Sequence, residues 1–276
     1  MRMLQERPSV RTALITLVLG MAVQCSYTQD IHFSQFFNTP LASGPGTIGT
    51  FDGDYRLNGI FRQQWRAVTI PYRTFALGGD AANAAGVKGL GLGAWIFNDK
   101  AGDSRLDQTH LSVGASWTEW LGASQEHALT GGLQFGFTNL SLDPSRLSFD
   151  SQYNGFYYDP TLGSGEQFAQ SSSARADVHA GAVYRYQVDA RTRVQIGFGA
   201  FNLTTPGISF LNGPSTELDM RTSTHVMVQF PIATKLDLLP MMQFMSQGEF
   251  QELAIGSNLR YILLQRFGLQ RAVVFG

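Results

Sequence analysis

The sequence predicts an all-β protein, a transmembrane antiparallel β-barrel of the bacterial outer membrane. Apolar and polar residues alternate over segments of about ten residues, the length that a tilted strand needs to cross a bilayer. Only 15% of the 276 residues are charged, whereas soluble domains average about 25%. Glycine (30 residues) and aromatic residues (12%) are frequent, as in barrels whose outer face contacts lipid. A secreted β-sandwich has a similar composition and stays open as an alternative.

The first part of the chain, residues 1–28, has the composition of a signal peptide. Three arginines precede an apolar stretch from Thr12 to Val23, and Ser26-Tyr27-Thr28 supplies small residues for cleavage before position 29. The only cysteine, Cys25, falls inside this segment, and the residue before it is not the small one that lipidation requires. We therefore expect a mature chain without a disulfide or a thiol nucleophile.

Residues 29–50 are rich in glycine and proline and predict an irregular N-terminal segment, on the periplasmic rim or in the lumen of the barrel. Residues 51–276 are predicted to form the barrel. It opens with Phe51–Asp80, where two strands of about ten residues flank a short turn. One face of the first strand is mostly polar, and the other begins with Tyr55 and Leu57. Soluble strands average five or six residues, so the length of this hairpin favours a membrane barrel.

Eight further segments show two-residue alternation, and each predicts one strand. The last two alternate less cleanly than the others. No segment after position 28 has a helical period of comparable length. In chain order the segments are Lys88–Phe97, Asp107–Thr118, His127–Asn139, Ala174–Val188, Arg193–Asn202, Met220–Phe230, Lys235–Ser246 and Glu252–Leu264.

The connections between these strands tend to alternate in length, as expected when outer loops are long and periplasmic turns are short. Leu140–Ser173 and Leu203–Asp219 are the longest, and Pro231–Thr234 is a near-minimal turn. Two connections that should lie outside, Ala67–Ile70 and the one near Gly248, are short. The length rule therefore holds only in part.

The number of strands bears on how the barrel closes. Ten strands are predicted, and an eleventh begins at Arg271–Phe275. A barrel must close so that no strand edge is unpaired in lipid, and bacterial barrels normally have an even number of strands. We therefore expect the sequence to be truncated at its C-terminus, with the last strands missing.

The residue types that carry chemistry in enzymes are not arranged as a site. The glycines of Lys88–Ala94 alternate within a predicted strand, where they leave room in the lumen rather than cradle a phosphate. The five histidines form no metal-binding motif, and no GxSxG sequence marks a nucleophile. The net charge of −1 does not favour nucleic acid as a partner. We predict no catalytic residue, metal or cofactor, and a hydrolase assembled from separate strands is a less favoured alternative.

Arginines and aromatic residues are interleaved near the turn of the first hairpin. Arg62, Arg66 and Arg73 lie among Trp65 and Tyr72. Such a cluster suits a partner-binding site. It equally suits an interfacial aromatic girdle with lumenal arginines paired to acids. The residue types alone favour neither interpretation.

Short motifs follow one another along the mature chain: Gln29–Phe36, Pro40-Leu41, Gly49–Arg56, Gln64-Trp65-Arg66, Pro71-Tyr72, Leu147–Gly155, Asp159-Pro160, Gly165-Glu166, Phe201-Asn202, Pro206 and Ser209–Leu211. In this order they resemble the PorP/SprF family, outer-membrane proteins associated with the type IX secretion system of Bacteroidota. The chain departs from the family where Gly44-Pro45-Gly46 replaces the usual Asn-Pro. Relatives also continue beyond Gly276 with further strands.

The resemblance implies a non-enzymatic outer-membrane component of the type IX secretion or gliding machinery, which receives or anchors a secreted surface protein. The implied partners are outer-membrane lipid, the C-terminal signal domain of a secreted cargo or adhesin, and periplasmic components of the secretion system. The contact surface would be the loops Leu140–Ser173 and Leu203–Asp219. The alternative is an outer-membrane channel for a small solute. The candidate partner-binding residues are Gln64, Trp65, Arg66, Tyr72, Phe149, Asp150, Gln152, Tyr153 and Phe210.

Overall fold

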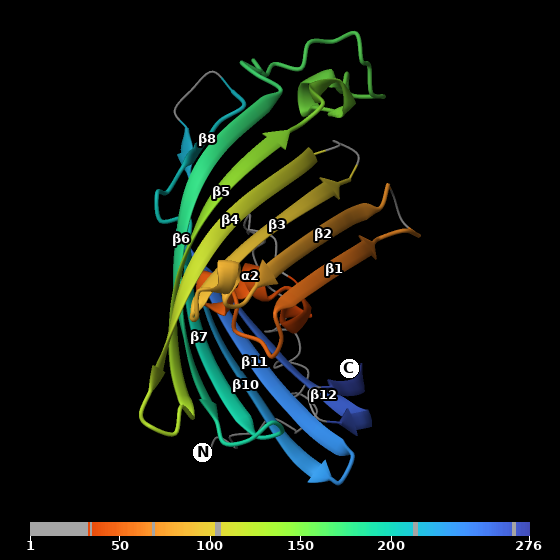
Figure 1. The fold of residues 1–276 in the computed structure, drawn as a ribbon. Helices are drawn as coiled ribbons and strands as arrows, with labels where there is room; N and C mark the ends of the chain where they lie inside the picture. Colours follow the sequence, from red (N-terminus) through yellow and green to blue (C-terminus); the bar gives the residue numbers. More distant parts are fainter. Residues whose placement is uncertain (1–32, 34, 68–69, 103–105, 212–214, 267–268) are drawn as a thin grey trace, which may run out of the picture. The chain divides into compact units, whose positions relative to one another are not determined.

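A single large antiparallel sheet dominates the chain, as the alternation of the sequence predicts (Figure 1). The computed structural model describes residues 33, 35–67, 70–102, 106–211, 215–266 and 269–276, so the predicted signal peptide lies outside the described residues. Neighbouring strands follow one another in chain order. They are β1 (Tyr55–Gln64), β2 (Tyr72–Ala81), β3 (Leu90–Ala101), β4 (Leu106–Leu121), β5 (His127–Ser141), β6 (Ser172–Gln187), β7 (Arg193–Phe201), β10 (Arg221–Ala233), β11 (Leu236–Gln247), β12 (Phe250–Arg266) and β13 (Leu269–Phe275).

All eleven predicted strands are present, and several are longer than the sequence pattern indicates. β4 has 16 residues and β12 has 17, because backbone pairing continues beyond the residues whose alternation marks the strand. Asn98, for example, lies beyond the predicted third strand and still pairs with Thr109. In the described residues β1 and β13 form the two edges of the sheet, so the predicted barrel is seen here as an open one.

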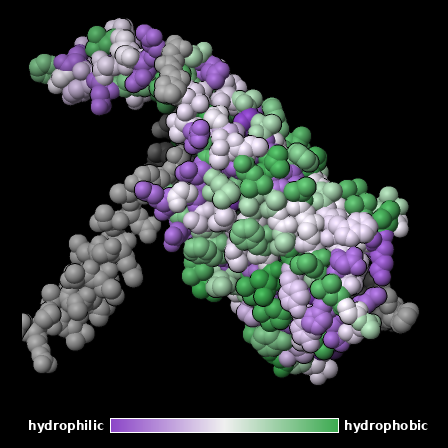
Figure 2. Space-filling view, turned by 90° about the vertical axis from the view of Figure 1, so that its left-hand side faces the viewer, coloured by the Kyte–Doolittle hydropathy of each residue, from purple (hydrophilic) through white to green (hydrophobic). Residues whose placement is uncertain are grey.

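The two faces of the sheet have opposite chemistry. On β5 the outward side chains of Leu133, Phe135 and Phe137 are more than half exposed, at 53%, 59% and 53%. The inward side chains of Gln134 and Thr138 are almost completely buried. Figure 2 shows hydrophobic residues in green over the strands. A sandwich buries its apolar faces between two sheets, whereas an outer-membrane barrel turns them outward. The burial pattern therefore favours the barrel over the sandwich.

The inner face of the sheet is covered by the segment before β1. This segment contains η1 (Phe36–Asn38), α2 (Pro40–Ser43) and η2 (Pro45–Thr47). η2 contacts β4, β5, β6 and β7, and α2 contacts β3 and β10 (Figure 1). Leu41 and Ile48 join Trp95 of β3 in a buried apolar cluster. The segment predicted as irregular thus forms short helical turns in the lumen, which we call the plug segment (residues 36–50).

Glycines on the strands make room for the plug segment. A β-carbon at Gly132 would lie 2.3 Å from the carbonyl oxygen of Pro45, and one at Gly91 would lie 2.9 Å from the carbonyl oxygen of Ile48. Real β-carbons do not approach other atoms so closely, so larger residues at these positions would displace the segment. The prediction that the glycines of the Lys88–Ala94 stretch leave room in the lumen is confirmed at Gly91.

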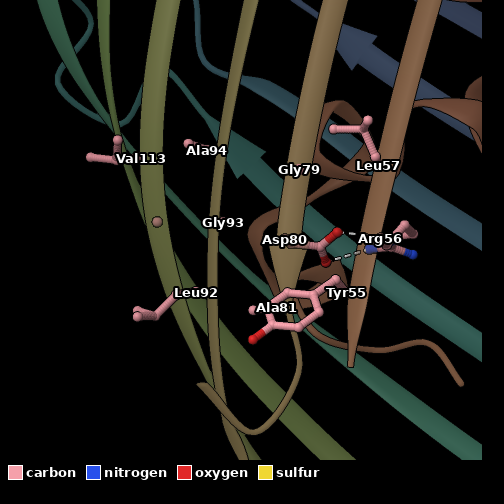
Figure 3. Close-up of a pocket in the computed structure, with 11 residues that line it drawn as sticks. Tyr55, Arg56, Leu57, Gly79, Asp80, Ala81, Leu92, Gly93, Ala94 and Val113 are labelled. Atoms are coloured by element: carbon pink, nitrogen blue, oxygen red, sulfur yellow. Dashed lines mark hydrogen bonds and ion pairs between the residues drawn. The ribbon is translucent and has the colours of Figure 1, made fainter. Parts of the chain in front are cut away.

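A buried ion pair also holds the plug segment. Arg56 donates to both carboxylate oxygens of Asp80, at 2.9 and 2.7 Å (Figure 3). The same arginine donates to the carbonyl oxygen of Thr47, and the backbone N–H of Gly49 donates to Asp80 at 2.8 Å. Ser116 on β4 donates to the carbonyl oxygen of Ile48 at 2.7 Å. The polar inner face therefore satisfies the backbone groups of the plug segment that helices would otherwise pair.

Few other regular elements occur. None of the helices in the described part of the chain has the length and hydrophobicity of a membrane-spanning helix. The remaining elements are η3 (Ala84–Gly86), η4 (Pro144–Arg146), η5 (Asp150–Gln152), β8 (Gly207–Ile208) and β9 (Thr216–Glu217), and the last two pair as a small separate sheet.

Candidate partner-binding surface

The long connections lie at one end of the sheet. Because successive strands are antiparallel, connections alternate between the two ends. We call one the loop end; it carries the connections 65–71, 102–105, 142–171, 202–220 and 248–249. We call the other the turn end; its connections are shorter than the two long loops. All nine predicted partner-binding residues belong to the loop end.

Four of these residues belong to the first hairpin. Gln64 and Tyr72 form its last paired position, and Trp65 follows with a φ of 60° and 65% of its side chain exposed. Arg66 is also exposed. The hydroxyl of Tyr72 lies against Gly102 of the next connection at the loop end, since a β-carbon there would be 3.3 Å from it. This group is therefore an exposed corner beside β3.

The neighbouring arginines separate into two environments. Arg62 faces inward, where it donates to the hydroxyl of Thr74 at 3.3 Å and lies over the ring of Phe33. Arg66 and Arg73 are exposed. The inward position of Arg62 matches the interpretation of lumenal arginines. The exposed arginines match either a girdle or a partner site.

Gln152 fixes the fold of the 142–171 loop. Its side-chain carbonyl accepts the backbone N–H of Phe149 at 3.1 Å and the hydroxyl of Tyr158 at 3.3 Å. Its side-chain amide donates to the carbonyl oxygen of Leu162 at 3.2 Å, and its backbone carbonyl accepts the N–H of Asp159 at 2.8 Å. Because Gln152 is buried, we assign it to positioning the loop rather than to touching a partner.

The two long loops are joined to each other. Phe168 and Leu211 form a β-bridge, and the carbonyl oxygen of Phe210 accepts the backbone N–H of Ala169 at 2.9 Å. The side-chain amide of Gln170 donates to the carbonyl oxygen of Ser209 at 2.7 Å. The rings of Phe149 and Phe168 lie 6.2 Å apart. Phe149 and Phe210, predicted from separate motifs, thus lie on either side of one junction.

Exposed aromatic side chains gather on the 142–171 loop. The predicted residue Tyr153 is 56% exposed and pairs in a bridge with Tyr158. Phe156 is 91% exposed and Tyr157 63%. The sequence prediction missed Phe156, Tyr157 and Tyr158, although a run of three aromatic residues in a polar loop is an unusual signal for exposed apolar surface. We call the described residues of the joined loops with these aromatics the loop platform (142–171, 202–211 and 215–220).

The predicted residues therefore form two groups. Phe149, Asp150, Gln152, Tyr153 and Phe210 belong to the loop platform. Among the described residues, no hydrogen bond, ion pair or ring contact joins them to the first-hairpin group, which the sheet separates by several strands. The first-hairpin group is Gln64, Trp65, Arg66 and Tyr72. The two groups lie at the same end of the sheet without forming one site.

A hollow on the outward face of β1 to β4 is apolar. Gly79, Ala81 and Ala94 lie between the larger side chains of Leu57 and Leu92, and the cavity has a volume of about 680 Å³ (Figure 3). The exposed lining residues Tyr55, Leu57, Leu92 and Val113 lie on the apolar outward face, and the inward pair Arg56 and Asp80 also borders the hollow. Such a surface suits lipid contact rather than chemistry.

Interior histidines come close to one another without forming a metal site. The rings of His110 and His179 lie 6.2 Å apart, and His110 stacks on Phe97. The Nδ1 atom of His179 accepts the backbone N–H of Asn202 at 3.1 Å. Within the described residues no group of three His, Cys, Asp or Glu side chains is placed to hold a metal ion.

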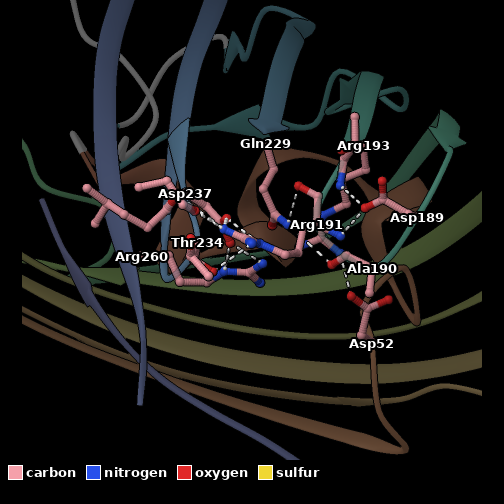
Figure 4. A network of polar contacts seen from close by, with 12 residues as sticks. Asp52, Asp189, Ala190, Arg191, Arg193, Gln229, Thr234, Asp237 and Arg260 are labelled. Carbon is pink, nitrogen blue, oxygen red and sulfur yellow. Dashed lines mark hydrogen bonds and ion pairs between the residues drawn. The ribbon is translucent and has the colours of Figure 1, made fainter. Parts of the chain in front are cut away.

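The turn end contains a dense ionic network. Arg191, in the connection between β6 and β7, pairs with the buried Asp237 of β11 and donates to the carbonyl oxygens of Thr234 and Ala233 (Figure 4). Arg260 of β12 pairs with the other oxygen of the same carboxylate at 2.6 Å. This network ties the connection between β6 and β7 to the connection between β10 and β11 and to strands β10, β11 and β12, at the end opposite the loop platform.

Comparison with known families agrees with this arrangement. The family described as type IX secretion system membrane protein PorP/SprF matches residues 25–270, which is most of the chain. No curated protein sequence matches the chain. The all-β sheet with an apolar outward face fits the outer-membrane location of a secretion-system membrane protein. The chain belongs to the PorP/SprF family and is an outer-membrane component of the type IX secretion system.

Proposed function

We propose that this protein is a non-enzymatic component whose loop end receives or anchors a secreted protein at the cell surface. The supporting observation is the loop platform, in which two loops joined at Phe168 and Leu211 present exposed aromatic side chains. Aromatic residues are enriched in protein–protein interfaces. Because the loops are already tied together, less conformational entropy is lost when a partner binds.

In this proposal the loop end faces the outside of the cell. Long loops of outer-membrane barrels are extracellular, and short turns are periplasmic. The C-terminal signal domain of a secreted cargo or adhesin binds at the loop end. Periplasmic components of the secretion and gliding machinery meet the turn end. Residues 1–28 act as the signal peptide, residues 29–50 are the segment that precedes the barrel, and residues 51–276 belong to the barrel.

The alternative function, a channel for a small solute, has less support. Conduction requires open space along the inner face of the sheet. There the plug segment contacts β4 to β7, and Asp80 and Ser116 hold its backbone by hydrogen bonds. This packing favours a scaffolding role over conduction.

The experiment compares surface proteins on cells that carry different variants. Phe156→Ser combined with Tyr157→Ser removes the two most exposed aromatic rings of the described part of the loop platform and leaves the contacts of Gln152 in place. The control, Leu121→Ser with Val188→Ser, changes two exposed apolar residues at the turn end. Proteins released from intact cells by brief protease treatment are then quantified.

We expect at least one secreted protein to disappear from the surface of cells with the loop variant, while the variant stays in the outer membrane at its normal level. The turn-end control should display the same proteins as the wild type. An unchanged set of surface proteins in the loop variant would rule out this function.

A further inference from the structure

We propose that the loop platform selects a partner whose contacting surface is rich in arginine and lysine. This inference rests on the proposed function and adds the chemistry of the partner. It follows from the negative charge of the platform, the exposure of its aromatic side chains and the interleaving of acidic and aromatic residues in the sequence of the 142–171 loop.

The platform is strongly acidic, whereas the whole chain is nearly neutral. Residues 142–171 contain four acidic residues and one basic residue, a net charge of −3, and residues 202–220 contain two acidic residues and no basic one. Residues 1–28 carry +2, so the predicted mature chain has a net charge of −3, of which the platform carries −5 and all other residues +2. The acidic residues are Asp143, Asp150, Asp159, Glu166, Glu217 and Asp219, and the basic one is Arg146.

Most of this charge is presented to solvent. Asp150, Glu166 and Glu217 are exposed, on both of the joined loops. The ion pair between Arg146 and Asp143 is long at 3.7 Å and solvent-exposed. Exposed pairs of this kind neutralise little of the surrounding field. The hydroxyl and backbone N–H of Thr161 donate to Asp159 and hold its pKa below the usual value, so this carboxylate stays charged at neutral pH.

Aromatic rings lie among these carboxylates in the chain. Tyr153, Phe156 and Tyr157 follow Asp150 and precede Asp159, and all three are more than half exposed. A guanidinium or ammonium group is attracted to an aromatic face, and the aliphatic stem of arginine or lysine packs against apolar surface. Both kinds of group on this loop therefore attract a cationic side chain. An acidic partner would meet repulsion at the same positions.

The acidic field also affects how fast a partner arrives. A surface of one charge sign raises the association rate of oppositely charged proteins, and added salt weakens this attraction. At about 0.15 M ionic strength charges more than about 8 Å apart are largely screened. Only the attraction between the platform and partner charges that touch it then remains. Binding should therefore be salt-sensitive without being abolished by physiological salt.

The test uses the full chain refolded in detergent and two immobilised peptides. One peptide is arginine-rich, and the other has glutamate at each arginine position. The platform variant is Asp150→Asn, Glu166→Gln and Glu217→Gln, whose carboxylates are exposed. The matched control is Asp54→Asn, Glu119→Gln and Glu126→Gln, which removes the same charge at or near the turn end. Unheated gel migration checks that each variant folds.

We expect the wild type to bind the arginine peptide and not the glutamate peptide. The platform variant should lose about tenfold in affinity, and the control should change by less than about twofold. Equal binding of both peptides, no binding of either, or an unchanged platform variant would overturn the inference. Preferential binding to anionic lipid vesicles, or association of the chain with itself through the platform, would also count against it.

Surface display separates this inference from the proposed function. If the aromatic variant loses a surface protein while the charge variant keeps it and still binds the arginine peptide normally, cargo reception stands and the charge preference fails. If neither variant alters display but the peptide preference holds, the platform is cation-selective and the proposed cargo function fails.

Discussion

Gly132 on β5 has room for a hydrogen atom but not for a β-carbon. The carbonyl oxygen of Pro45 would lie 2.3 Å from such a carbon, whereas a β-carbon at the adjacent Gly131 would meet nothing within 4 Å. The two residues point to opposite faces of the same strand. A substitution at Gly132 therefore tests the packing of the plug segment, and the same substitution at Gly131 measures the general effect of replacing a glycine in this strand.

Gly132→Val should destabilise the protein by about 1–3 kcal/mol or expel the plug segment, because the added side chain overpacks the inner face. Gly131→Val should be neutral or slightly stabilising, since valine favours strands and its side chain faces outward. The check is urea unfolding followed by unheated gel migration. Protease cleavage before Thr50 shows whether the plug segment has been expelled from the sheet. Equal effects of the two substitutions would contradict this packing.

Asp237 is the residue on which the turn end depends most. Its side chain is fully buried and pairs with Arg191 and Arg260, which are 19% and 12% exposed. Removing a buried carboxylate leaves two cations without their partner, and breaking such pairs costs about 3–5 kcal/mol. Partial exposure of both guanidinium groups places the expected loss at the low end of this range.

Asp237→Ala should accordingly lower the midpoint of urea unfolding clearly. Asp52→Ala serves as the control, because it removes an ion pair to Arg193 in which the carboxylate is 57% exposed. Exposed pairs contribute about 0–1 kcal/mol. If both variants unfold at the same urea concentration, the buried network does not stabilise the turn end as described.

At the scale of elements, the 142–171 loop is held by a few polar contacts and not by a core. Gln152 connects η5 to Leu162 and to Tyr158, and together with its bond to Phe149 these contacts span residues 149–162. A loop of this length without a large core is expected to be among the less stable parts of the fold. The conformation of the platform is therefore more sensitive to Gln152 than the sheet is.

Gln152→Ala should speed protease cleavage within the loop and leave the unfolding of the sheet unchanged. The physical reason is the loss of three side-chain hydrogen bonds, each of which contributes about 0.5–1.5 kcal/mol. Gln167→Ala, an exposed position on the same loop, is the control. Cleavage at the same rate in both variants would remove Gln152 from this role.

The strands were predictable from sequence because alternation is a local signal that the membrane environment imposes. Their ends were not, since residues such as Asn98 pair through the backbone without regard to hydropathy. Phe149 and Gln152 were identified through the family motif, but the motif does not distinguish the buried Gln152 from a contact residue. The junction of Phe168 with Leu211 joins loops distant in sequence, and no local pattern encodes it.

On the scale of the whole sheet, the two ends differ in chemistry, and so do the two faces. The outward face is apolar and the inward face holds the plug segment by glycine clearance and polar contacts. A buried carboxylate, Asp237, pairs with two arginines at the turn end, while the loop platform presents exposed acidic residues together with exposed aromatic ones. A rigid base with a less stable, exposed end suits a protein that captures partners.

The most direct test of the proposed reception of cargo is photo-crosslinking in living cells. A photoreactive amino acid is placed at Tyr157 on the loop platform or, as the control, at Val188 of the turn end, both of which are more than half exposed. We predict that the probe at 157 crosslinks to a secreted protein and the probe at 188 does not. A secreted protein crosslinked only at 188, or at neither position, would contradict the account.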